Sequence, residues 1–446
     1  MNSRSPGKKL TPPRIMALGF ATLILLGTIF LALPISIHEG KHISIIDAFF
    51  TATSAACVTG LVVKDTLNDF TVFGQAVILI LVQLGGIGFM TAATWVALLL
   101  RRKISLRERL ILKEAMNQND MQGVVRLTRR VLFYALTMEG VAALVFAAYW
   151  SNDMPLGRAI YHGIFHSVSL FNNAGFELFG EFRGMTPFVE DVVLNVVSMI
   201  LIVSGGIGFI VMSELIEYKE KRKLSLHAKI VLSATGILIM LGALVVFVFE
   251  YTNIGTLGPL HEGSKVLASF FSSVSLRSSG TNTIDISAMR QGTQFFMMLM
   301  MFIGAAPGST GGGIRITTFV ILLGAVVTMM RGREDVVMFR NTIPKEQVYK
   351  ALTITILAVF VVTIATMILS LTQDAPFLAI LFETTSAFGT VGLSMGLTQE
   401  LTITGKLIII IIMFLGRLGP LTLAYALQSK VSKELYRYPK GTIYIG

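Results

Sequence analysis

Cysteine and charge are both scarce in this chain. Cys57 is the only cysteine among 446 residues, which excludes an intramolecular disulfide framework and a cysteine-rich metal site. Charged residues make up 14% of the sequence, against about a quarter in soluble domains, while 53% of the residues are hydrophobic. Several apolar runs reach about 20 residues, enough for a helix to cross the hydrocarbon core. The sequence therefore predicts an integral membrane protein.

Motifs of catalysis and nucleotide binding are also missing. No nucleophile–base pair or metal set is recognisable, so we expect no enzymatic activity and no covalently bound cofactor. Gly85-Gly-Ile-Gly88 resembles part of a nucleotide fingerprint, but it lies inside a predicted spanning helix rather than at a strand-to-helix turn. His162 and His166 are one helical turn apart, yet no further metal ligand is in view, and we expect them to make structural contacts.

A short segment that ends in glycine occurs four times. The four glycines are separated by 115, 105 and 112 residues: Gly60, Gly175, Gly280 and Gly392. A second glycine cluster follows each one after 25, 30, 24 and 24 residues: Gly85, Gly205, Gly304 and Gly416. Because the loop glycine and the following glycine cluster recur together at similar spacings in four copies, they indicate an internal repeat.

Each copy is predicted to contain a span, a short helix, the glycine loop and a second span. The repeats cover residues 15–100, 131–216, 230–330 and 351–428. Their first spans are residues 15–33, 131–150, 230–249 and 351–371, and their second spans are 72–100, 192–212, 295–330 and 407–427. The short helices, residues 43–56, 156–169, 264–275 and 376–386, are too short to span comfortably and are interpreted as re-entrant or buried. Twelve ordinary helices are the alternative, which the short segments and glycine loops disfavour.

The distribution of charge predicts the orientation. The segments 1–14, 101–130, 217–229, 331–350 and 429–446 hold 27 Lys and Arg against 9 Asp and Glu, a balance of +18. The rest of the chain carries −7, which gives the overall +11. Since positive loops stay in the cytoplasm, both termini are predicted inside, and the charge is not attributed to nucleic-acid binding. The glycine loops then open outward, with four acidic residues near the outer mouth: Asp65, Asp69, Glu177 and Glu181.

Four glycine loops that met on one axis would form a ring of backbone carbonyls. Non-helical backbone at membrane depth is tolerated only where it is buried or lines a water-filled cavity. Carbonyl rings replace the hydration shell of a monovalent cation, and each short helix directs the negative end of its dipole at its loop. A single glycine would be explained by helix packing, but four in register favour a pore. The predicted filter consists of Val58, Thr59, Gly60, Asn173, Ala174, Gly175, Ser278, Ser279, Gly280, Thr390, Val391 and Gly392.

The fourfold plan and the loop endings resemble a known family. The loops end Val-Thr-Gly60, Asn-Asn-Ala-Gly175, Arg-Ser-Ser-Gly280 and Gly-Thr-Val-Gly392. They are similar to the loops of the Trk/Ktr/HKT cation transporters over nearly the whole chain, and most similar to the Ktr-type membrane subunit, because the first span starts almost at once.

The resemblance implies an all-α membrane protein with four repeats in pseudo-fourfold symmetry around one potassium pore. It also implies a bacterial cell-membrane location, a homodimer, surrounding membrane lipid and a cytosolic nucleotide-binding ring of the RCK type. Potassium would be the transported ion and the only metal at the filter, sodium a candidate activator, and any nucleotide would bind through the partner.

The second span of the third repeat, residues 295–330, is predicted to break and form a gate. As one helix, residues 295–330 would be about 54 Å long, against a hydrocarbon core of about 30 Å. Pro307 removes a backbone donor, and the glycines around it disfavour helix. The resemblance adds Arg417, which would lie beneath the filter and hydrogen-bond the loop. The predicted gate comprises Gly304, Ala305, Ala306, Pro307, Gly308, Ser309, Thr310, Gly311, Gly312, Gly313 and Arg417. A passive kink is the alternative.

Other polar residues within the apolar segments have structural interpretations. We expect Arg277 to brace the filter, and Glu139 and Glu383 to be buried and paired. The run from Met297 to Met301 is interpreted as core. For the whole protein, the alternative function is a secondary cation symporter with a broken-helix binding site, which four copies rather than two halves disfavour.

Overall fold

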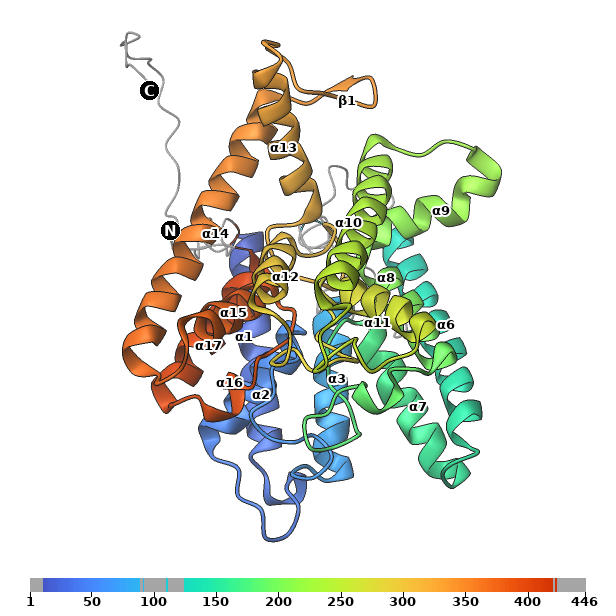
Figure 1. Cartoon of the computed structure of the whole chain (residues 1–446), viewed down its shortest axis with the longest axis vertical. Coiled ribbons are helices and arrows are strands. Elements are labelled where there is room, and N and C mark those ends of the chain that lie inside the picture. The colour runs from blue at the N-terminus through green and yellow to red at the C-terminus, as the bar shows by residue number, and fades with distance from the viewer. Residues whose placement is uncertain (1–10, 89–90, 92–109, 111–123, 420–421, 423–446) are drawn as a thin grey trace, which may run out of the picture.

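The computed structural model describes residues 11–88, 91, 110, 124–419 and 422, and the fold of this part is mostly helical (Figure 1). Four described helices are long and apolar enough to cross a membrane, and they contain the four predicted first spans apart from the last residues of the first one. They are α1 (Pro12–Leu31), α6 (Val124–Trp150), α10 (Leu226–Glu250) and α14 (Lys345–Thr372). Pro12 at the first turn of α1 and the Ser225 side chain that caps α10 explain where two of them begin.

Four shorter helices lead into the glycine loops, as predicted. They are α2 (Ile45–Cys57), α7 (Leu156–Phe171), α11 (Glu262–Ser275) and α15 (Phe377–Gly389). α2 begins with a capping box, in which the Ser44 hydroxyl accepts from the Asp47 N–H at 3.1 Å and the Asp47 carboxylate accepts from the Ser44 N–H at 3.4 Å. Each helix packs against the long helix that precedes it.

The second spans of the first, second and fourth repeats are not the continuous helices that the sequence predicts. α3 (Val72–Ile87), α8 (Val192–Gly206) and α17 (Ile403–Leu418) each end early, and α9 (Phe209–Lys221) follows α8 after a bend of 104°. The predictions for residues 72–100, 192–212 and 407–427 were therefore wrong about continuity. The cause is a glycine with a φ that a helix cannot adopt: +90° at Gly88, +90° at Gly208 and +82° at Gly419. Residues 89–90, 92–100, 420–421 and 423–427 of these predictions lie outside the described residues.

The predicted break in the third repeat is confirmed. α12 (Gln291–Ile303) and α13 (Ile316–Met330) are separated by non-helical chain that begins at Gly304. α13 and α14 extend beyond the body of the molecule and carry a hairpin at their tip (Figure 1). The hairpin pairs β1 (Val337–Met338) with β2 (Asn341–Thr342) in antiparallel register, a small departure from the all-α prediction. The remaining elements are α16 (Leu397–Glu400) and two 3₁₀ turns, η1 (Pro34–Ser36) and η2 (Thr186–Phe188).

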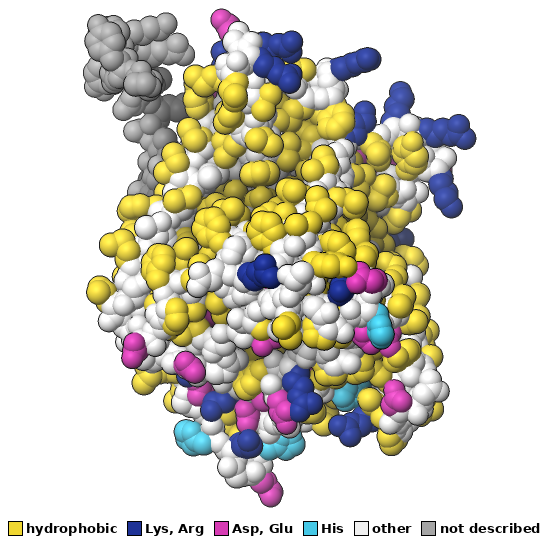
Figure 2. Space-filling model, viewed as in Figure 1, with side chains coloured by type: hydrophobic (Ala, Val, Ile, Leu, Met, Phe, Trp, Pro, Cys, Tyr) yellow, Lys and Arg dark blue, Asp and Glu magenta, His cyan; other side chains and the backbone are white. Residues whose placement is uncertain are grey.

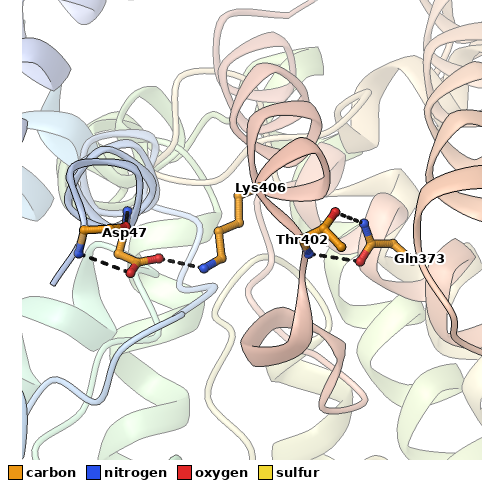
Figure 3. A network of polar contacts seen from close by, with 5 residues as sticks. Asp47, Gln373, Thr402 and Lys406 are labelled. Carbon is orange, nitrogen blue, oxygen red and sulfur yellow. Dashed lines mark hydrogen bonds and ion pairs between the residues drawn. The ribbon is translucent and has the colours of Figure 1, made fainter. Parts of the chain in front are cut away.

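The two ends of the described chain pack against each other. One buried cluster combines Phe50 and Ile78 with Phe388 and Ile409. At one edge of this contact, Lys406 of α17 forms a 2.7 Å ion pair with Asp47 of α2, and both side chains are largely buried (Figure 3). Two hydrogen bonds join Thr402, which caps α17, to Gln373 at the end of α14 (Figure 3). The Thr402 N–H donates to the side-chain carbonyl of Gln373, and the side-chain NH₂ of Gln373 donates to the Thr402 hydroxyl. These contacts join the first and the fourth of the predicted repeats.

Candidate functional site

The four glycine loops share one backbone conformation. The φ angles of their glycines are +88° at Gly60, +69° at Gly175, +75° at Gly280 and +91° at Gly392. The residue two positions earlier is also left-handed in every loop, with φ of +57° at Val58, +60° at Asn173, +92° at Ser278 and +47° at Thr390. Valine and threonine rarely adopt this region, so a strained backbone recurs at matching positions and must be held by its surroundings.

A serine near the end of each short helix holds the loop that follows. Ser54 and Ser386 each accept a 3.1 Å hydrogen bond from the N–H of their own loop glycine, Gly60 and Gly392. Ser169 donates to the carbonyl of Phe176 at 2.6 Å, and Ser275 donates to the carbonyl of Thr281. Sequence reasoning assigned these serines no role. Their recurrence six residues before the glycine, or five in the third copy, was the available signal.

The loops contact one another in a closed cycle. A Cβ added to Gly60 would lie 2.5 Å from the carbonyl oxygen of Ala174, and one added to Gly175 would lie 2.9 Å from that of Ser279. A Cβ on Gly280 would lie 2.4 Å from the carbonyl oxygen of Val391. A Cβ on Gly392 would lie 2.1 Å from that of Thr59, which returns the cycle to the first loop. Glycine is therefore required at all four positions by space as well as by φ.

Four buried carbonyl groups lie along this cycle. Thr59, Ala174, Ser279 and Val391 are all fully buried. Their carbonyl oxygens accept no hydrogen bond from any residue that the structure describes. Buried carbonyl groups nearly always have a hydrogen-bond partner. A ring of carbonyl oxygens without one can instead coordinate a dehydrated monovalent cation. The arrangement can thus act as a ligand set for a cation.

The second glycine landmark packs against the end of the short helix. A Cβ on Gly85 would lie 2.0 Å from the carbonyl oxygen of Ala56, and one on Gly416 would lie 2.0 Å from that of Phe388. In the second copy the corresponding distance, from Gly205 to the Phe171 carbonyl oxygen, is 1.9 Å. This close approach explains why, in three copies, a second glycine follows the loop glycine at a similar spacing. In the third, a Cβ on Gly304 would instead meet the Gly312 carbonyl oxygen at 2.2 Å.

The segment Gly304–Gly313, which we call the gate loop, is seated on the broken end of α8. The N–H groups of Ala306 and Thr310 donate to the carbonyls of Gly206 and Gly205 at 3.0 and 3.3 Å. The N–H of Phe209 donates to the carbonyl of Gly308 at 2.9 Å. The break at Gly208 therefore frees backbone groups that the gate loop pairs with, and eight of the ten loop residues are buried.

Two arginines bind the gate loop. Arg417 donates to the carbonyl of Thr310 and to those of Gly85 and Gly86, so the predicted contact with the loop is present. Arg315 donates to the carbonyls of Ala306 and Gly311. Sequence reasoning missed Arg315, although a basic residue two positions after the glycine run and just before an apolar helix was a usable signal.

The remaining polar residues have mostly neutral partners. Glu139 is buried and accepts from the amides of Gln83 and Asn172 at 2.9 and 3.1 Å. Glu383, also buried, accepts from the hydroxyls of Ser394 and Thr398. Both acids are thus buried and paired as predicted, with amides and hydroxyls.

Two other predictions concern Arg277 and the histidines. Arg277 is buried, but its Nε and Nη2 atoms have no hydrogen-bond partner within the described residues, so the expected brace is not made through them. His166 makes structural contacts: its Nε2 accepts from the Leu178 N–H at 3.2 Å. The described residues contain no group of three or more metal-ligating side chains.

In the Met297–Met301 run, all four methionines are buried, as expected for core.

Comparisons with known proteins agree on one family. The family model described as TrkH, cation transport protein, matches residues 20–435. The Ktr system potassium uptake protein B of Bacillus subtilis is 43% identical over 98% of this chain and 97% of its own length. The potassium/sodium uptake protein NtpJ of Enterococcus hirae is 37% identical over 98% of both chains.

A solved structure shares the fold. The crystal structure of the potassium transporter TrkH from Vibrio parahaemolyticus superimposes with a TM-score of 0.75 and covers 96% of this chain and 87% of that one. The sequences are 18% identical in this alignment, so the likeness concerns the fold. All three proteins carry the names of transporters or uptake proteins and none that of an enzyme.

Proposed function

The chain belongs to the TrkH family of cation transport proteins, and on that premise we propose that it is the ion-translocating membrane subunit of a Ktr-type potassium uptake system. The observation that carries the proposal is the closed cycle of four glycine loops with its buried, unpartnered carbonyls. In this proposal the twelve loop residues predicted from the sequence form the selectivity filter. Since all four cycle positions are glycine, no side chain narrows the ring, and potassium fits.

The proposed pore is built from four repeats, residues 15–100, 131–216, 230–330 and 351–428, in pseudo-fourfold symmetry. Matching φ angles at two positions of every loop support this arrangement. At one end of the molecule, over α9 and the hairpin tip, nearly all the charged side chains in view are Lys and Arg, whereas most of the acidic and histidine side chains, together with further Lys and Arg, lie toward the other end (Figure 2). We therefore propose that the hairpin end and both termini are cytoplasmic and that the glycine loops open outward in a bacterial cell membrane.

The gate loop, with Arg417 and Arg315, is proposed to obstruct the ion path until a regulator releases it. The gate loop is non-helical, and most of its residues are buried beside the glycine loops. Non-helical backbone at membrane depth must either be buried in protein or line a water-filled cavity. The hydrogen bonds from Arg315 to the Gly311 carbonyl and from Arg417 to the Thr310 carbonyl hold the gate loop in this position.

The regulator is proposed to be a cytosolic nucleotide-binding ring that docks on the basic face of a homodimer. Exposed Arg331 and Arg333 lie between α13 and the hairpin. We expect the purified protein to bind such a ring, and nucleotide to raise potassium flux into vesicles only when the ring is present. Reversing both charges, Arg331→Glu with Arg333→Glu, should weaken ring binding about tenfold because complementary charge steers association. Arg183→Glu, at an exposed site in the segment that follows the second glycine loop, is the control. A ring that binds the double variant as tightly as the wild type would refute this docking face.

Vesicle flux also tests the function itself. Protein reconstituted without a partner should pass potassium down its gradient at a low basal rate, with or without sodium and in preference to sodium, and the ring with its nucleotide should raise that rate. No potassium flux under any condition, or flux strictly coupled to a second ion, would overturn the proposed pore.

External pH should modulate uptake through Glu177. The pKa of this carboxyl is raised to about 7, chiefly because the group is buried; hydrogen bonds from the N–H groups of Phe179 and Gly180 oppose this rise, and the negative charge of Asp65 adds to it. Since the raised pKa makes Glu177 neutral below about pH 7 and charged above it, potassium uptake should fall about twofold as external pH drops from 8 to 6. Uptake by Glu177→Gln should be low and flat across this range. Glu181→Gln, at an exposed site, should keep the wild-type curve, and a Glu177→Gln protein with that same curve would exclude this role.

A further inference from the structure

Three of the four left-handed positions that precede the loop glycines carry polar side chains. They are Asn173, Ser278 and Thr390, and the matching residue of the first loop is Val58. All three polar residues are fully buried. The sequence pattern placed them among the ion-binding residues of the filter. The ligands of that predicted filter are backbone carbonyls, and in the structure the side chains of these three residues reach the gate loop.

The Ser278 hydroxyl joins the gate loop to the fourth glycine loop. It accepts a 3.2 Å hydrogen bond from the N–H of Gly312, and it donates to the carbonyl oxygen of Thr390 at 2.8 Å. A single hydroxyl thus connects gate-loop backbone to a filter carbonyl. While the gate loop is seated, the Thr390 carbonyl is engaged by Ser278, which reduces its availability as an ion ligand.

Packing on this side leaves no room for a side chain on the gate loop. A Cβ on Gly312 would lie 2.3 Å from the Thr390 hydroxyl oxygen, and one on Gly311 would lie 2.7 Å from the Ser278 hydroxyl oxygen. The two glycines are therefore required by direct contact between gate loop and filter. A loop that only kinked the helix for packing would need no such contact.

The second glycine loop is tied to the gate loop as well. The Asn173 amide and the Thr310 hydroxyl share a 2.9 Å hydrogen bond. Thr310 is the residue whose carbonyl accepts from Arg417. The gate loop is thus docked on three of the four loops of the cycle, and Val58 offers no polar group on the remaining side.

We propose that Asn173, Ser278 and Thr390 are positioning residues that dock the gate loop on the filter, so that the selectivity for potassium over sodium depends on whether the gate loop is seated. This inference rests on the proposed function. Release of the gate loop removes the Gly312 and Thr310 partners, frees the Ser278 hydroxyl and the Asn173 amide, and relaxes the strained backbone at three filter positions together.

The variant Ser278→Ala tests the proposal in the full-length protein reconstituted in vesicles. Without the hydroxyl the N–H of Gly312 is no longer held beside the Thr390 carbonyl, so the gate loop leaves the filter more often. Basal potassium flux should therefore rise about fivefold, and the potassium-to-sodium flux ratio, which depends on the seated gate loop, should fall by a similar factor. Thr366→Val is the matched control, because it removes a buried hydroxyl that bonds only within the protein core, to Val362 and Thr384. It should change neither quantity.

A second comparison separates docking from a purely local effect on the filter. In a protein that lacks residues 306–311, Ser278→Ala should add nothing to basal flux or to the flux ratio, because its gate-loop partner is already displaced. An equal change of the flux ratio in both backgrounds would overturn the docking proposal and leave the pore intact. Wild-type flux and ratio in Ser278→Ala would overturn it too. Failure of the wild-type protein to pass potassium would instead refute the proposed function.

Discussion

Deletion of residues 306–311 should produce a protein that passes potassium without its regulator. The deletion removes most of the gate loop, including the bonds from Ala306 and Thr310 to the end of α8 and the carbonyl that Arg417 binds. Each bond contributes about 1 kcal/mol, so loss of several should favour the open path by at least about a hundredfold in equilibrium, and basal flux should rise by about tenfold or more. Potassium flux into vesicles, with and without the ring and nucleotide, measures this effect.

Arg417→Ala should raise basal flux by a smaller factor, because Arg315 still holds the Ala306 and Gly311 carbonyls. Arg417→Lys keeps the charge but cannot bridge Thr310 and Gly85 with a planar fork, so its flux should lie between those of wild type and Arg417→Ala. If the gate loop is instead a passive kink, the deletion should lower thermal stability without any rise in flux. A deletion protein with wild-type stability and normal, still-regulated flux would exclude the gate.

Gly60→Ser should largely abolish discrimination between potassium and sodium. Gly60 has a φ of +88°, which serine tolerates poorly, and its Cβ would lie 2.5 Å from the carbonyl oxygen of Ala174 in the next loop. That oxygen must move, and it is one of the four unpartnered carbonyls of the cycle. A loss of about 1.4 kcal/mol of differential binding corresponds to a tenfold lower potassium-to-sodium flux ratio, and we expect at least about this loss.

The control for this substitution is Gly236→Ser. Gly236 lies in α10, and a Cβ there would meet nothing within 4 Å, so selectivity should stay at the wild-type value. Uptake kinetics for both ions, measured on both variants, give the comparison. An unchanged flux ratio in a folded Gly60→Ser protein would mean that the cycle of glycine loops does not select the ion.

Local features of the sequence determined the larger part of this picture. Apolar runs of spanning length, short helices before each glycine and the four glycines in register depend on composition and periodicity, which a sequence displays directly. The break after Ile303 was also visible, because Pro307 and five glycines cannot continue a helix. The identity of the filter residues and the gate stays a prediction, supported by the closed cycle of loops and by the Arg417 contact.

Only the tertiary structure decided how the loops and breaks are connected. Gly88, Gly208 and Gly419 end their helices through positive φ angles, yet their sequences read as apolar helix, because a glycine shows its φ only when other elements require it. The partners of Thr310 are Asn173 and Arg417, 137 and 107 residues away along the chain. Contacts over such separations depend on the packing of whole helices, and no local pattern encodes them. The packing of whole helices therefore placed the side chains of three predicted filter residues, Asn173, Ser278 and Thr390, against the gate loop.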